Sequence, residues 1–286
     1  MKPLWDTTMK DKDKFRRDRL FRKDRFFKKD KMKKGIYILP NLFTTASLFA
    51  GVYSVISSIT GQFVHAAVAI PISLILDGLD GRIARMTRTT SRFGVEYDSL
   101  ADLVAFGVAP AVLAYTWSLS TYGRWGWLVA ALFVTCGALR LARFNIQIGV
   151  IDSKVFNGLA IPAAALVVAT TVMLYDYVGG VGPFHHPAVL GGIVVLALLM
   201  VSNVKYYSFK DLNLFTREPF MSFIVLVLLL IVVVAEPQVM LFTFAVSYAV
   251  SGPIWLFFKL LKKIIHGEVK KGEKGEIGDQ QKKPMT

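Results

Sequence analysis

The chain has 286 residues, of which 54% are hydrophobic, and it carries a formal net charge of +14. This composition excludes an ordinary soluble domain and indicates a protein that crosses a membrane several times. The only cysteine, Cys136, excludes a disulfide framework and a cysteine-based metal cluster.

Residues 1–34 form a basic arm that precedes the first apolar run. The arm repeats a six-residue pattern of aromatic, basic and acidic residues over 15–20, 21–26 and 27–32. Six residues match neither the 3.6-residue nor the 7-residue helical period, so an in-plane amphipathic helix is poorly patterned here. Because the arm leads directly into a membrane span, we expect it to contact anionic membrane lipid, at about 1 kcal/mol per basic residue, and not nucleic acid. A solvated tail is the alternative.

From residue 36 onward, apolar runs of about the length needed to cross a bilayer follow one another. Helices are expected, because a spanning segment must satisfy its own backbone hydrogen bonds. The predicted spans are 36–59, 63–86, 95–119, 125–147, 158–178, 187–203, 219–235 and 238–261. The stretch 219–261 is also compatible with one hairpin or a re-entrant pair. The predicted fold is an all-α integral membrane protein with about eight transmembrane helices.

The basic residues predict the orientation of these spans. With the N-terminus inside, only Arg124 among the 34 Lys and Arg residues falls on the outer side. An excess of basic residues on the cytoplasmic side is the rule for membrane proteins. We therefore expect a multi-pass protein of the cell (inner or plasma) membrane with both termini in the cytoplasm.

Four aspartates lie where apolar residues would be expected. Asp77 and Asp80 are three residues apart, and Asp98 and Asp102 are four apart, so each pair shares one face of a helix. Carboxylates are costly in a membrane and mark functional sites. Two antiparallel helices joined by a short cytoplasmic turn would bring the pairs together. Hard oxygen ligands of this kind suit Mg²⁺ or Mn²⁺, and two such cations would clamp a diphosphate.

The residues around the aspartates allow a functional and a structural interpretation. Gly78 and Gly81 permit either close helix packing or close approach of a ligand. Arg85 is a candidate phosphate contact, and Ser91 is a candidate hydrogen-bond donor. Each of them could alone be an interfacial anchor or a packing residue, whereas four acids within one short stretch have no structural role to fill.

The complete pattern reads Asp77-x-x-Asp80-Gly81-x-x-Ala84-Arg85, followed after eight residues by Gly94-x-x-x-Asp98-x-x-x-Asp102. It resembles the signature of the CDP-alcohol phosphotransferases without a departure. The resemblance implies that family's helical membrane fold and the transfer of a phosphatidyl-type group from a CDP-linked lipid to an alcohol, with release of CMP. It further implies that all four aspartates bind metal and that Asp102 is also the general base.

Other segments are similar to the phosphatidylserine synthase branch of that family. They include Pro40-Asn41-Leu-Phe-Thr44-Thr45 with the following Gly51, and Asp98 through Pro110, where Ala105 replaces a usual serine. The resemblance implies a CDP-lipid site made by Asn41, Thr44, Gly81, Ala84, Arg85 and Ser91. It also implies CDP-diacylglycerol and L-serine as substrates and a homodimer.

Serine is a zwitterion, so its site needs a cation for the carboxylate. The candidate cations on the predicted inner side are Arg140, Arg143, Lys205 and Lys210. All four can equally be anchors that obey the positive-inside rule, and this alternative is strongest for the two lysines. The other acceptors left open are glycerol 3-phosphate, inositol phosphate and choline, and an archaeal-type lipid donor is also open. A cation transporter is the alternative from a different class.

The predicted organisation of the chain has four parts. A basic cytoplasmic arm covers 1–34, a catalytic transmembrane core covers 35–215, and further transmembrane helices cover 216–262. The remaining residues, 263–286, are rich in Lys, Glu, Gly and Gln and are expected to form a disordered cytoplasmic tail.

Overall fold

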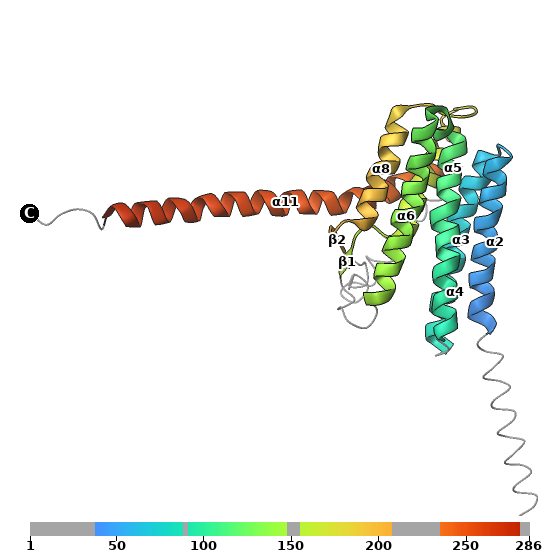
Figure 1. Ribbon diagram of the computed structural model, residues 1–286, viewed down its shortest axis with the longest axis horizontal. Coiled ribbons are helices and arrows are strands. Elements are labelled where there is room, and N and C mark those ends of the chain that lie inside the picture. Colours follow the sequence, from blue (N-terminus) through green and yellow to red (C-terminus); the bar gives the residue numbers. More distant parts are fainter. Residues whose placement is uncertain (1–37, 88–90, 148–154, 208–234, 281–286) are drawn as a thin grey trace, which may run out of the picture.

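The computed structural model describes residues 38–87, 91–147, 155–207 and 235–280. These residues form a helical bundle with one small sheet (Figure 1). In chain order the elements are α2 (Ile38–Ile59), α3 (Phe63–Thr87), α4 (Arg92–Asp102), η1 (Leu103–Val108), α5 (Ala109–Trp117), η2 (Leu119–Tyr122), α6 (Arg124–Gln147), β1 (Val155–Asn157), α7 (Ile161–Tyr177), α8 (Pro187–Val201), β2 (Lys205–Tyr207) and α11 (Pro237–Gln280).

Within the described residues, five helical segments are long and apolar enough to cross a membrane. They are α2, α3, the continuous segment α4–η1–α5, α6 and the first part of α11, and the shorter apolar helices α7 and α8 lie between the last two in sequence. These segments coincide with seven of the predicted spans. The predicted span 219–235 lies outside the described residues, so the total of eight stays a prediction.

Helices α2 and α3 pack closely through small side chains. The Ser47 and Ser73 hydroxyls hydrogen bond across the interface at 2.7 Å, and Ser54 donates to the carbonyl of Ala66 at 2.8 Å. Small residues of this kind let helices in a membrane approach one another closely. Gly61 ends the hairpin turn with φ +77°, a conformation that glycine adopts without strain.

The segment from α4 to α5 is one span interrupted by a π-helical stretch. In η1 the backbone N–H of Ala109 donates to the carbonyl of Val104, five residues back. Helix α2 packs directly on this stretch, because a Cβ added to Gly51 would lie 2.7 Å from the Cα of Ala105. The contact gives a steric reason for a glycine at 51 opposite a small residue at 105.

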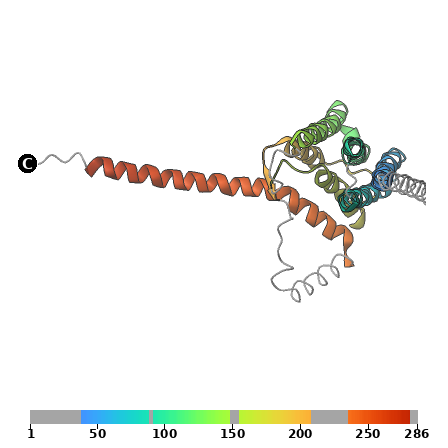
Figure 2. The same ribbon diagram turned by 90° about the horizontal axis from the view of Figure 1, so that it is seen from below.

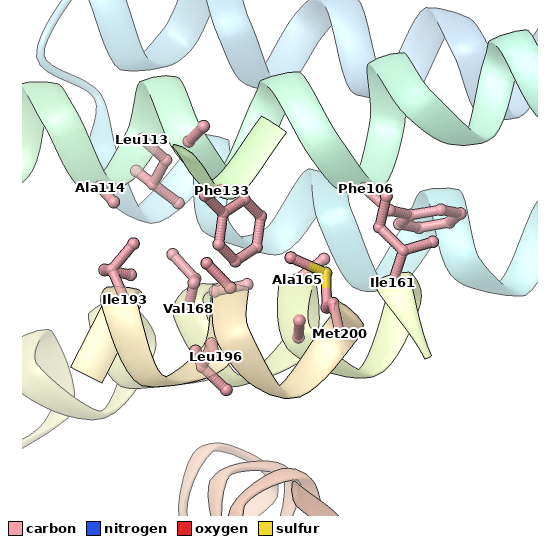
Figure 3. Close-up of a cluster of buried hydrophobic side chains, with 14 of the residues drawn as sticks. Phe106, Leu113, Ala114, Phe133, Ile161, Ala165, Val168, Ile193, Leu196 and Met200 are labelled. Carbon is pink, nitrogen blue, oxygen red and sulfur yellow. The ribbon is translucent and has the colours of Figure 1, made fainter. Parts of the chain in front are cut away.

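The apolar core lies between α5, α6, α7 and α8. Figure 3 shows side chains from these helices and from η1 pointing toward one another. The labelled residues of this cluster are Phe106, Leu113, Ala114, Phe133, Ile161, Ala165, Val168, Ile193, Leu196 and Met200. Because lipid tails are as apolar as this core, close packing and not water exclusion stabilises it.

Two short antiparallel strands join the segments before α7 and after α8. Residues 155 and 207, and residues 157 and 205, are paired between β1 and β2. The bend that follows requires Gly158, which has φ +82° and whose added Cβ would lie 2.3 Å from the carbonyl oxygen of Met200. This sheet was not predicted from the sequence, because three-residue strands show no alternating pattern.

Helix α11 first packs on the bundle and then extends away from it (Figure 2). Pro253 lies inside the helix, and proline is the usual cause of a bend. At its packed end, the Tyr177 hydroxyl of α7 donates to the carboxylate of Glu236. The helix continues to Gln280, into the segment predicted as the tail.

Candidate active site

Helices α3 and α4 bring the four aspartates together at one end of the bundle. Asp77 and Asp80 lie near the end of α3, and Asp98 and Asp102 lie on α4. Asp77, Asp98 and Asp102 each offer one carboxylate oxygen, and these oxygens lie within 4.8 Å of one another. Three of the four acids thus form one close group, and Asp80 lines the adjoining pocket together with Asp98.

The fourth acid is held by helix α2. The Thr44 hydroxyl donates to Oδ2 of Asp80 at 2.6 Å, and both residues are about 5% exposed or less. The bond ties the first span to the acid-bearing hairpin. The sequence indicated Thr44 as a nucleotide contact but gave no sign of this bond, which joins residues far apart in the chain.

The acid cluster fits divalent cations on two observations. Oδ1 of Asp98 and Oδ1 of Asp102 are buried and accept no hydrogen bond from the described part of the protein. Buried acceptors of this kind normally have a partner, and several carboxylates so close together repel one another unless cations lie between them. The donors are all oxygen atoms, which suit Mg²⁺ or Mn²⁺.

A pocket adjoins the acids between α2, α3 and the start of α4. It is lined by Pro40, Asn41, Thr44, Asp80, Gly81, Ala84, Arg85, Ser91, Gly94, Val95 and Asp98. This set contains all six residues predicted for the CDP-lipid site. Asp98 belongs to both the pocket and the acid cluster, so the two form one continuous site.

The glycines of the site differ in what they allow. A Cβ at Gly78 would meet nothing within 4 Å, and one at Gly81 would meet only the guanidinium of Arg85, at 3.5 Å. The sequence allowed two interpretations of these glycines, close helix packing or close approach of a ligand. Within the described chain, close helix packing is wrong for both glycines. Gly81 instead opens the wall of the pocket.

Three residues that line the pocket were not among the predicted contacts: Pro40, Gly94 and Val95. Gly94 could have been predicted as a pocket residue, because it belongs to the aspartate motif and follows Ser91 by three residues. The Ser91 hydroxyl caps α4 by accepting from the Gly94 N–H at 2.9 Å. A Cβ at Gly94 would also lie 3.5 Å from Oδ1 of Asn41, so this glycine brings two predicted pocket residues together.

The predicted serine-binding cations have different surroundings. Arg140 on α6 is partly buried, interacts electrostatically with Asp102, and has an Nε without an acceptor in the described protein. Arg143, one helical turn later, donates to Oδ1 of Asn203 at 2.8 Å. Arg140 thus interacts electrostatically with one of the acids, whereas Arg143 joins α6 to the segment before β2.

Of the two predicted lysines, the structure describes only Lys205. Lys205 begins β2 and is exposed, with Asn157 of β1 as its strand partner. Lys210 lies outside the described residues. Asn145, which was not predicted, links α6 to α4 by donating from Nδ2 to the Ser99 hydroxyl at 2.8 Å.

Comparison with known proteins agrees with this geometry. The family model of the CDP-alcohol phosphatidyltransferases matches residues 37–204, which contain all four aspartates and every residue that lines the pocket. The chain belongs to this family. The CDP-alcohol phosphatidyltransferase region ends before β2 and does not include α11.

Curated relatives extend the likeness beyond that region. A Helicobacter pylori protein named CDP-diacylglycerol–serine O-phosphatidyltransferase is 44% identical over 82% of this chain and 97% of its own length. A Methanocaldococcus jannaschii protein of the same name is 36% identical over 58% of this chain and 76% of its own. A Methanothermobacter thermautotrophicus protein named archaetidylserine synthase is 33% identical over 59% and 69%.

Proposed function

We propose that this protein transfers the phosphatidyl group of CDP-diacylglycerol to L-serine and releases phosphatidylserine and CMP. The observation that carries the proposal is one continuous site, in which Asp98 belongs both to the acid cluster and to the pocket lined by all six predicted CDP-lipid residues. The names of the relatives support serine as the acceptor. One name specifies a diacylglycerol lipid and the other an archaeal lipid, but both specify serine as the group that the lipid is joined to.

Each part of the site has a distinct role in this proposal. Asp77, Asp80, Asp98 and Asp102 hold two Mg²⁺ or Mn²⁺ ions, which when bound offset the charge of the diphosphate and of the leaving group. Asn41, Thr44, Gly81, Ala84, Arg85 and Ser91 bind the CDP group. Arg85 supplies donors to phosphate oxygens from the edge of the pocket.

The reaction is a displacement at phosphorus. Asp102 takes the proton of the serine hydroxyl, and the serine oxygen forms a bond to the phosphorus that carries diacylglycerol. The bond between that phosphorus and the bridging oxygen breaks, and CMP leaves with both electrons. Arg140 of α6 interacts electrostatically with Asp102 of α4, which supports Arg140 as the cation that binds the acceptor.

The alternatives agree less well with the site. A phosphorylated acceptor needs several cations close together, whereas Arg143 of the described chain points its guanidinium to Asn203 and Lys205 is exposed on β2. A cation transporter needs polar groups along its path. The described acid cluster instead lies beside a pocket at one end of the bundle.

We also propose where the enzyme lies in the cell, how its chain is divided and how it assembles. We place the protein in the cell membrane with both termini in the cytoplasm, and the arm 1–34 on anionic lipid, because of the distribution of basic residues. The core covers 35–215, further spans cover 216–262, and 263–286 is cytoplasmic. A homodimer is also part of the proposal, and it rests on the family resemblance.

CMP release by purified protein tests the function. The protein is incubated with CDP-diacylglycerol, Mn²⁺ or Mg²⁺, and serine, glycerol 3-phosphate, inositol phosphate or choline in turn. We expect release with serine, its loss on chelation of the metal, and a fall of more than 100-fold in kcat for Asp102→Asn. Release with glycerol 3-phosphate and none with serine would refute the acceptor assignment. Cation flux in liposomes without any nucleotide lipid would favour a transporter.

A further inference from the structure

Helix α11 passes the end of the bundle that carries the acids. The end of α6 is bonded to α4 there, because the Asn145 amide donates to the Ser99 hydroxyl at 2.8 Å, and it is also bonded to the segment before β2. On β2, the Tyr206 hydroxyl donates to the carbonyl of Ala249 of α11 at 3.0 Å. A Cβ at Gly252 would lie 2.4 Å from the Tyr206 ring, so β2 and α11 are in close contact. The positive-inside rule predicts that this end faces the cytoplasm.

Beyond Pro253, α11 runs across the direction of the bundle helices and not along it. Figure 1 shows α2, α3 and α6 side by side along one direction and the free part of α11 along another. In Figure 2 the bundle helices are seen nearly end-on, whereas α11 is seen along its length. Because α2, α3 and α6 are long and apolar enough to cross a membrane, a helix that runs across them follows the membrane surface.

The free part of α11 has an apolar face and a basic face. Ile254, Phe257 and Phe258 have the spacing of one helix face, and they are 49%, 61% and 64% exposed. Trp255 and Lys259 are four residues apart on another side of the helix, and the ammonium lies 5.2 Å from the centre of the indole ring. The sequence continues both spacings within the helix, with apolar residues at 261, 264 and 265 and lysines at 262 and 263.

This pattern suits the boundary between lipid headgroups and acyl chains. An amphipathic helix binds there with its apolar face toward the acyl chains, and its binding is stronger on anionic lipid when its polar face is basic. The charges are complementary, because the cytoplasmic leaflet is the one that carries anionic lipid. The apolar face is also continuous with the candidate span, which ends at Lys259.

We propose that residues 254–265 of α11 form an in-plane helix that binds anionic lipid at the cytoplasmic surface of the membrane. The apolar face lies among the acyl chains, and the lysines lie at the headgroups. The inference uses the proposed orientation of the spans but not the proposed reaction. It assigns membrane contact to a part of the chain beyond the family region.

Cysteine labelling of the protein in lipid nanodiscs tests the two faces. In a Cys136→Ala background, residues 257–264 are replaced by cysteine one at a time and exposed to a water-soluble maleimide. The cysteines at 257, 258, 261 and 264 should react about tenfold more slowly than those at 259, 262 and 263, because only the apolar face lies in lipid. Equal labelling of all positions, fast or slow, would overturn the proposal. Thermal unfolding of each variant at the wild-type midpoint shows that the fold is kept.

Charge reversal tests the lipid partner. In nanodiscs of phosphatidylcholine with about a third phosphatidylglycerol, Lys262→Glu/Lys263→Glu should raise the labelling rate of Phe258→Cys about tenfold or more, since each lysine strengthens binding to an anionic surface about fivefold. Lys282→Glu/Lys283→Glu is the matched control, because it changes the net charge equally but lies beyond the last residue of α11. Its labelling rate should equal that of Phe258→Cys alone. An equal effect of both pairs would contradict a specific role of the helix.

Fluorescence quenching identifies what covers the apolar face. A bimane attached at Phe258→Cys should be quenched by lipids that are brominated in their acyl chains. Slow labelling without quenching would show that a protein surface covers this face, and it would overturn the proposal. None of these measurements depends on CMP release, so a failure of the proposed reaction and a failure of this inference are distinguishable.

Discussion

The bond between Thr44 and Asp80 predicts how the first span contributes to metal binding. Replacing Thr44 by valine keeps the shape of the side chain and removes the donor to Oδ2 of Asp80. The hydroxyl can donate to only one acceptor at a time, and the carboxylate at 2.6 Å is a stronger acceptor than the Pro40 carbonyl at 3.2 Å. Valine at position 44 therefore leaves Oδ2 of Asp80 without this donor.

The size of the effect follows from these contacts. A hydrogen bond to an ionised group contributes about 1.5–3 kcal/mol, and loss of a residue that orients a metal ligand typically costs about 10- to 100-fold in metal affinity. We expect Thr44→Val to need at least tenfold more Mn²⁺ for half-maximal CMP release. Direct titration of Mn²⁺ should show the same shift, and Thr44→Ser should restore most of the affinity.

Thr45→Val is the matched control for this prediction. The Thr45 hydroxyl lies 2.7 Å from the carbonyl of Asn41 and 2.9 Å from the Tyr97 hydroxyl, and neither partner is an acid. Its Mn²⁺ requirement should therefore equal that of wild type. If Thr44→Val bound Mn²⁺ as tightly as wild type, the bond would have no part in holding the metal. If Thr45→Val were equally impaired, the effect would belong to α2 as a whole.

Two further predictions concern stability. Gly51→Val should lower the free energy of unfolding by about 1–3 kcal/mol, because its Cβ would lie 2.7 Å from the Cα of Ala105. Gly78→Ala is the control, because a Cβ at this position would meet no atom within 4 Å. It should unfold at or above the wild-type midpoint in a thermal scan. Gly158→Ala should also lower the midpoint, since alanine is strained at φ +82° and its Cβ would lie 2.3 Å from the carbonyl oxygen of Met200. Gly158→Ala as stable as wild type would contradict the bend described for this segment.

The spans could be predicted from the sequence because the apolar runs end at polar or charged residues or at glycine. The predicted span 63–86 is α3 (Phe63–Thr87), and 125–147 is α6 (Arg124–Gln147). The π-helical stretch in the third span could not be predicted, since it leaves the hydrophobicity of the run unchanged. The strands at 155–157 and 205–207 depend on pairing between distant segments, which short runs do not reveal.

The acids could be predicted for a different reason. Their helical spacing and their cost in a membrane single out Asp77, Asp80, Asp98 and Asp102 without knowledge of the fold. Residues placed by tertiary packing could not be found in this way. Tyr248 has no motif around it, and its position beside Tyr206 results from the packing of α11 against α7 and β2.

The π-helical stretch makes the length of the third span as important as its composition. One residue advances an α-helix by about 100°, so a single insertion or deletion rotates everything beyond it. The same helix must direct Asp98 and Asp102 toward the acid cluster at one end and bury Leu113 and Trp117 in the core at the other. The wide turn of η1 sets the angle between these two faces. Loss of one residue from 103–108 would thus keep every side chain of the site. It would nevertheless rotate Asp98 and Asp102 away from the acid cluster as long as Leu113 and Trp117 stay buried in the core.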